Sequence, residues 1–160
     1  MKSSQLQVRV SPIQKQALNQ AALAAGLDLS SWVLSKLLKD PQTQFSQKIE
    51  AIPEKKYSFA LADLADFLNG LDAEQFEKAL QKPWDRHLSP FLSNYIAAML
   101  EWSAHRLGVN TPWWLRQIEP LKEPYFGTKL QSLRFYLLHH SPAPFRARNI
   151  FIDTSLGGRV

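Results

Sequence analysis

A strict alternation of apolar and polar residues stands near the start of the chain. Leu6, Val8 and Val10 are apolar, and the positions between and before them are Gln5, Gln7 and Arg9. A period of two residues is typical of a β-strand with one buried and one exposed face. The pattern therefore predicts a strand over 6–10 whose outer face, together with Gln5 directly before it, carries three polar side chains.

Two short helices are predicted after this strand. Ser11 and Pro12 suit the N-cap and first turn of a helix, and Gly26 suits its left-handed C-cap. The apolar side of this helix is formed by Ile13, Ala17, Leu18, Ala21, Ala22 and Ala25. Ser30 and Ser31 give a second N-cap signal, so a second helix is expected from Trp32 to about Lys39.

One strand and two helices in about 35 residues bury too little apolar surface to be stable alone. A single strand also leaves two unpaired edges. Both problems are solved if two copies pair their strands antiparallel, and the paired strands then form a polar ribbon that fits the major groove of DNA. Residues 1–39 hold five basic residues and one acidic residue, a net charge of +4, which favours this interpretation. The alternative is an ordinary edge strand followed by a helical hairpin of a core.

The stretch 5–38 resembles the ribbon-helix-helix family of DNA-binding dimers, a group of β-ribbon proteins that read the major groove. The resemblance implies a homodimer formed through the N-terminal strand. It implies that bases are read by Gln5, Gln7 and Arg9. It also implies that DNA phosphates are held at the start of the second helix and by a nearby lysine, that is, by Ser30, Ser31 and Lys2.

The remainder is predicted to be helical, which makes the fold class mainly α. Residues 40–56 are polar and contain two prolines, so they are interpreted as a linker that can include one helical turn around 45–49, with an extra helix packed on the head as the alternative. Helical patterns follow after Ser58, Asp72, Ser89 and Thr128, and 150–153 is a short strand or an extended tail. The last helix is expected to turn Leu130, Leu133, Leu137 and Leu138 inward. The predicted domains are therefore a head over 1–39, a linker over 40–56 and a helical domain over 57–160.

Residues 88–156 are similar to a domain of antitoxins that are paired with nucleotidyltransferase-like toxins. The similarity rests on the segments 94–97 (NYIA), 123–126 (EPYF), 132–134 (SLR) and 145–152 (FRARNIFI). Most members of that group carry a different DNA-binding head, so this combination is a departure that leaves the type of toxin open. The resemblance implies that the helical domain binds a cognate toxin.

A cluster of arginines and aromatic residues marks the end of this domain. Such residues dominate the hot spots of protein interfaces, and partner binding is therefore assigned to Tyr125, Phe126, Phe145, Arg146, Arg148, Asn149 and Phe151. Two other interpretations remain open for Arg146 and Arg148, namely RNA binding and salt bridges within the domain.

Catalysis is not predicted. The four histidines lack the spacing of a metal site, and no nucleophile elbow or phosphate-binding loop is found. Arg134 and His139 resemble the Arg-x4–6-His pattern of helical ribonucleases, but a basic C-terminus of a helix explains them better. We therefore expect no enzyme activity, no metal and no cofactor.

The sequence also indicates the cellular compartment in which the protein works. There are no cysteines, no apolar run long enough to cross a bilayer and no signal segment over 1–11, which fits a bacterial cytoplasm. The favoured function is that of a type II antitoxin, which binds operator DNA, neutralises a toxin and regulates its own operon. The alternatives are a repressor that senses a small ligand in a pocket of Trp102, Trp113, Trp114 and Tyr125, or a helical ribonuclease.

Overall fold

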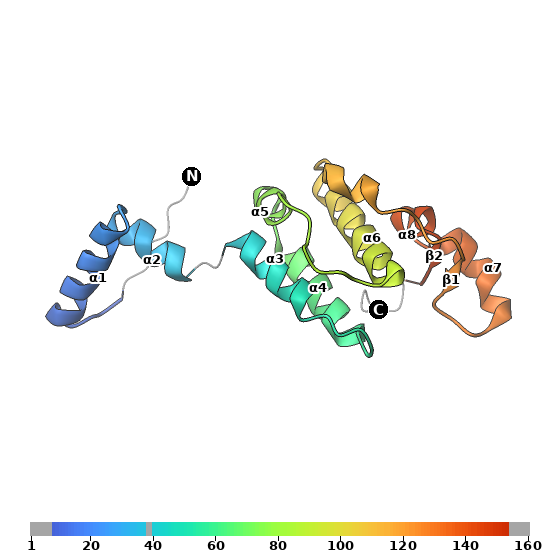
Figure 1. Ribbon diagram of the computed structural model, residues 1–160, viewed down its shortest axis with the longest axis horizontal. Helices are drawn as coiled ribbons and strands as arrows, with labels where there is room; N and C mark the ends of the chain where they lie inside the picture. Colours follow the sequence, from blue (N-terminus) through green and yellow to red (C-terminus); the bar gives the residue numbers. More distant parts are fainter. Residues whose placement is uncertain (1–7, 38–39, 154–160) are drawn as a thin grey trace. The chain divides into compact units, whose positions relative to one another are not determined.

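The computed structural model describes residues 8–37 and 40–153, and it confirms that the fold is mainly α (Figure 1). The chain divides into two compact units, Met1–Asp40 and Pro41–Val160. Within the described residues there are eight α-helices, one 3-10 helix and a sheet of two short strands.

The first unit is a helical hairpin of α1 (Pro12–Ala24) and α2 (Leu29–Leu37). Helix α1 begins with a reciprocal capping box. The Ser11 hydroxyl accepts from the backbone N–H of Gln14, and the Gln14 side chain accepts from the N–H of Ser11. Gly26 has a φ of 69°, the left-handed conformation predicted for it, and allows the turn into α2.

The predicted strand over 6–10 is not seen where the structure describes the chain. Val8, Arg9 and Val10 have no regular secondary structure, and Gln5, Leu6 and Gln7 lie outside the described residues. A strand is defined by hydrogen bonds to a neighbouring strand. A single copy of this unit supplies no such neighbour, so the ribbon is not expected to form without a second chain.

The second unit begins earlier than predicted, because the supposed linker over 40–56 is largely a helix of this unit. Helix α3 (Pro41–Glu50) buries Phe45 and Ile49, and Ile52 after it is also buried. These apolar residues pack with α4 (Ser58–Gly70) and α5 (Ala73–Ala79). Their spacing of three to four residues within a polar stretch was the signal of a helix packed on a core.

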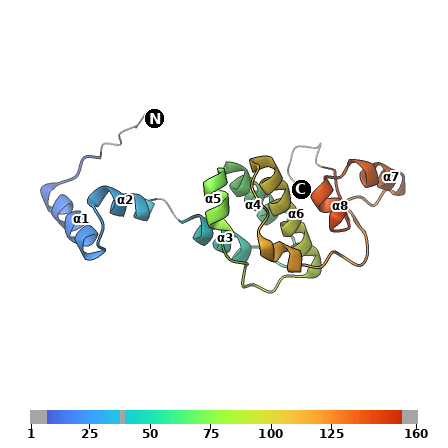
Figure 2. The same cartoon turned by 90° about the horizontal axis from the view of Figure 1, so that it is seen from above.

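Helix α6 (Pro90–Leu107) is central to the second unit, packing against α4 and α5 and also against α8 (Figures 1 and 2). It begins at the predicted Ser89 cap and ends at Gly108, whose φ is 68°. Seven consecutive residues, 94–100, are buried. Seven consecutive residues point in all directions around a helix, so α6 is covered by other elements on several sides.

The C-terminal half wraps around α6 with short elements. These are a 3-10 helix, η1 (Trp113–Gln117), then β1 (Tyr125–Phe126), α7 (Gln131–His140), α8 (Ala143–Ala147) and β2 (Ile150–Phe151). Strands β1 and β2 pair in parallel, with Tyr125 opposite Ile150 and Phe126 opposite Phe151. The run 150–153 is therefore a strand at its start, one of the two predicted possibilities.

Candidate functional sites

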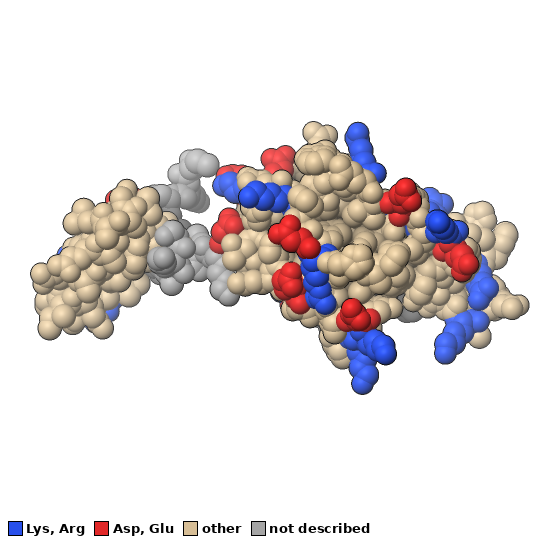
Figure 3. Space-filling view, in the orientation of Figure 1, with Lys and Arg blue, Asp and Glu red and all other residues tan. Residues whose placement is uncertain are grey.

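The first unit leaves most of its apolar side chains uncovered. Among its described side chains only Ala22 is buried. Ile13 and Leu23 are 81% and 77% exposed, and Val10, Leu27 and Leu34 are also exposed. Figure 3 shows that the visible face of this unit is almost free of charge. A helical hairpin of this kind has no core of its own and requires another apolar surface to be stable.

Only one member of the predicted base-reading triad can be placed. Arg9 is exposed, whereas Gln5, Gln7 and the predicted phosphate ligand Lys2 lie outside the described residues. The predicted difference between buried apolar and exposed polar side chains is not observed at 8–10 in the single chain, because Val8 is exposed as well, at 68%.

The predicted phosphate site at the start of the second helix needs a correction. Helix α2 begins at Leu29, earlier than Trp32, and its cap is the carboxylate of Asp28 in place of Ser30 and Ser31. Asp28 Oδ1 accepts from the backbone N–H of Ser31 at 3.0 Å. The hydrogen bonds from the side chain and backbone of Ser31 hold the pKa of Asp28 below its usual value. A phosphate at the N–H of Ser31 would therefore have to displace an anion that the protein itself supplies.

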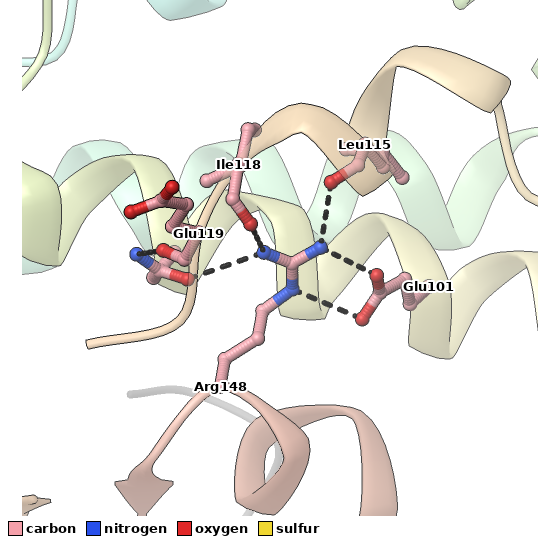
Figure 4. Close-up of polar contacts among 6 residues, drawn as sticks. Glu101, Leu115, Ile118, Glu119 and Arg148 are labelled. Carbon is pink, nitrogen blue, oxygen red and sulfur yellow. Dashed lines mark hydrogen bonds and ion pairs between the residues drawn. The ribbon is translucent and has the colours of Figure 1, made fainter. Parts of the chain in front are cut away.

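Arg148 occupies the interior of the second unit, and its guanidinium is fully engaged there (Figure 4). It pairs with both carboxylate oxygens of Glu101 on α6, and it donates to Asn94 Oδ1 at 3.1 Å. It also donates to the carbonyls of Leu115 and Ile118, at 3.1 and 3.3 Å. All five N–H groups of an arginine are thus used within the domain.

Two of the residues predicted to bind a partner are therefore structural. Arg148 and Phe145 are each only 5% exposed. The Phe145 ring packs edge-on against Tyr95, with centroids 5.2 Å apart. Asn149 is half-buried, has a φ of 62° and donates to the carbonyl of Leu121. Of the interpretations of Arg148, the structure shows the salt bridge within the domain.

The other predicted partner-binding residues lie nearer the surface. Arg146 is exposed, and Tyr125 is 39% exposed, with its ring 4.3 Å from that of Phe91. Partial burial raises the pKa of Tyr125. The rings of Phe126 and Phe151 stack at 4.9 Å across the two-stranded ladder. Arg146, Tyr125, Phe126 and Phe151 are thus at least partly accessible to a partner. The contact between the two phenylalanines already gives them a role in the packing of the domain.

Helix α7 carries an uncovered apolar surface that the sequence did not reveal. Its leucines were expected to face inward, but only Leu137 is buried. We define the α7 surface as the five exposed apolar residues of this segment, with exposed fractions between 40% and 72%: Leu130, Leu133, Phe135, Tyr136 and Leu138. Phe135 and Tyr136 interrupt the helical spacing of the leucines, and that interruption was the signal that apolar residues surround this helix.

The residues proposed for ribonuclease chemistry do not converge. Arg134 lies over the ring of Phe126, 5.1 Å from its centroid, whereas His139 contacts Phe135 edge-on. Positions five apart on a helix point in directions about 140° apart. No group of three or more metal-ligating side chains occurs among the described residues.

The aromatic residues proposed as a ligand pocket do not form one. Trp114 is buried and donates its indole N–H to the carbonyl of Leu80, while Trp113 is 66% exposed. Trp102 lines a different hollow of about 140 Å³ between α4 and α6, together with Tyr95 and Ser103. Burial of Tyr95 in this region raises the pKa of its hydroxyl, which stays protonated.

Comparisons with protein-family models, curated proteins and solved structures gave no match for this chain. None of the helices described here has both the length and the apolar character that crossing a membrane requires.

Proposed function

We propose that this protein is the antitoxin of a type II toxin–antitoxin system in a bacterial cytoplasm. In this proposal two copies pair through their N-terminal strands into a ribbon-helix-helix head that binds operator DNA. The second unit binds and neutralises a cognate toxin, and the complex regulates its own operon. The protein acts by binding and has no catalytic role.

The observation that supports this proposal most is the lack of a core in the first unit. Ala22 is its only buried residue among the described side chains, and Ile13 and Leu23 are almost fully exposed. Burying an apolar side chain contributes about 1.5–3 kcal/mol. A second copy of the same hairpin supplies the missing apolar surface, and it also supplies the partner edge that residues 6–10 need to become a strand.

The separation of the chain into two units supports the division of roles. The hairpin ends before Asp40, and the second unit has a core of its own from α3 onward. Such an arrangement allows one unit to bind DNA while the other binds a protein.

A gel-shift titration tests the DNA-binding half of the proposal. The probe is the duplex upstream of the protein's own gene, and the variants are Arg9→Ala and, as a matched control, Lys15→Ala. Both side chains are exposed cations of the same unit, but only Arg9 belongs to the predicted reading face. We expect Arg9→Ala to weaken binding by about 1–3 kcal/mol and to relax the preference for one base pair. Lys15→Ala should have a smaller effect that does not depend on sequence.

Equal losses in the two variants would show that Arg9 contributes only charge, and the ribbon assignment would then be wrong. Sedimentation measurements complement the titration, because the proposal requires a dimer in the absence of DNA. A chain that stays monomeric at micromolar concentration would refute it.

A further inference from the structure

Helix α7 is short and poorly covered for a helix of its composition. Five of its ten residues are large and apolar, and only Leu137 is buried. Figures 1 and 2 both show α7 at the edge of the second unit, near α8, and Figure 1 shows the β1–β2 ladder beside it. A ten-residue helix is marginal by itself and is normally stabilised by packing of its apolar side. The α7 surface is therefore a place where another molecule would complete the packing.

The segment that contains α7 carries basic residues only, whereas one acidic residue, Asp153, lines a hollow beside Leu133 and Tyr136. The segment 127–141 contains Lys129 and Arg134, two histidines and no acidic residue. On the face drawn in Figure 3, basic side chains project at the end of the second unit that α7 occupies, with acidic side chains beside them. An apolar surface with more cations than carboxylates around it is complemented by an apolar surface that carries carboxylates.

A second copy of this chain does not provide that complement through the same surface. A two-fold contact places each residue of a patch against the same patch of the other copy. Each copy would bring two cations, Lys129 and Arg134, against the single carboxylate of Asp153 beside this surface, so the contact would gather charge of one sign in excess. Self-association through α7 is thus opposed by charge.

A nucleic acid fits this surface less well than a protein does. Bases bind by stacking on free aromatic rings. The Tyr136 ring is already stacked on His140, with centroids 3.9 Å apart, and Phe135 contacts His139 edge-on. The remaining members, Leu130, Leu133 and Leu138, offer apolar contact alone.

We propose that the α7 surface is where the second unit binds its protein partner, and that the partner presents apolar residues flanked by aspartate or glutamate. This inference rests on the proposed function, since it identifies the surface that captures the toxin and the chemistry of the toxin's matching face. Phe135, the most exposed of the five at 72%, is the anchor of the contact, and Arg134 is the nearest basic residue along the helix.

The test uses the full-length protein and, as probe, the purified product of the gene adjacent to its own. The variants are Phe135→Asp and Arg134→Glu. The matched control is Phe59→Asp on α4, because Phe59 is 89% exposed and lies outside the α7 surface. We expect Phe135→Asp to raise Kd at least about 100-fold, as replacing an interface anchor does. Arg134→Glu should raise Kd about tenfold and reduce its dependence on salt. The control should change Kd less than about twofold.

Hydrogen exchange gives a second measurement that needs no variant. Amides of 131–140 should exchange slowly in the complex and faster in the free protein. Thermal unfolding and gel shifts of each variant must match the wild type, which separates lost binding from lost folding and from lost DNA recognition.

The outcomes distinguish the two proposals. If the wild type binds the probe but both α7 variants bind equally well, the assignment of this surface is wrong and the proposed function stands. If the wild type does not bind the probe, the proposed function fails and the inference fails with it. If Phe135→Asp instead abolishes an association between copies of this chain, α7 is a homomeric interface and the inference is overturned.

Discussion

Removal of the Arg148 side chain should destabilise the second unit without any partner being present. Arg148→Ala leaves three groups without their donor, namely the Glu101 carboxylate, the Asn94 amide oxygen and the carbonyl of Ile118, and it removes one of the two donors to the carbonyl of Leu115. Breaking a buried ion pair by removing one partner costs about 3–5 kcal/mol. The Glu101 side chain keeps 23% of its exposure and can recover some hydration. We therefore expect a loss of about 3 kcal/mol, at the lower end of that range.

Urea unfolding followed by tryptophan fluorescence measures this loss, because Trp114 is buried in the same unit. Arg148→Lys should recover only part of it, since one ammonium cannot reach Glu101 and both carbonyls together. Arg146→Ala is the matched control, an exposed arginine two residues away, and should change the free energy of unfolding by less than about 0.5 kcal/mol. A loss below about 1 kcal/mol for Arg148→Ala, or an equal loss for the control, would refute the structural role of this arginine.

Two further predictions concern helix ends. Gly108 has a φ of 68° and free space around its Cα. Gly108→Ala should therefore lower the free energy of unfolding by about 1 kcal/mol through backbone strain alone, and Gly108→Asn should lower it less. Urea unfolding of the two variants measures the difference. The pKa of Asp28 is lower in the folded protein than its ordinary value near 3.8, so the ionised carboxylate stabilises α2. This stabilisation is fully present at pH values above 3.8, and it disappears as the pH falls through the lower pKa of the folded protein. Far-ultraviolet circular dichroism should therefore show helix loss in acid that Asp28→Asn lacks, and identical acid transitions would contradict the cap.

Several helix ends were predictable from sequence because their chemistry is local, whereas α4 and α7 have no side-chain cap, and α7 begins at Gln131, later than expected from Thr128. The capping boxes at Ser11 and Asp72 and the left-handed turns at Gly26 and Gly108 each depend on residues within one helical turn. The start of α2 was predicted too late, because Ser30 and Ser31 are good caps themselves and Asp28 was assigned to the loop. In the structure the cap of α2 is Asp28, two residues before Ser30.

Contacts between distant segments were less predictable. The buried role of Arg148 depends on Glu101, which is 47 residues away, and no local pattern distinguishes it from the exposed Arg146. Phe45 and Ile49 lie in a stretch so polar that its helix was taken for a linker. Conversely, the leucines of α7 have the spacing of a buried face, but only Leu137 is buried. Whether a side chain is buried depends on which distant segments pack against it, and the periodicity of apolar residues does not identify those segments.

The two ends of the segment that contains α7 are hydrogen-bonded to two neighbouring residues, Phe151 of β2 and Ile152 directly after it. The N–H of Gly127 donates to the carbonyl of Phe151, and the Ser141 hydroxyl donates to the carbonyl of Ile152. Gly127 lies so close to that strand that an added Cβ would stand 3.2 Å from Ile152. Because the two ends of the segment are held together, the exposed residues from 128 to 140 can be exchanged as one cassette while the buried Leu137 and the rest of the domain are kept. A lineage could thus acquire a new binding specificity by replacing this cassette without refolding the rest of the domain.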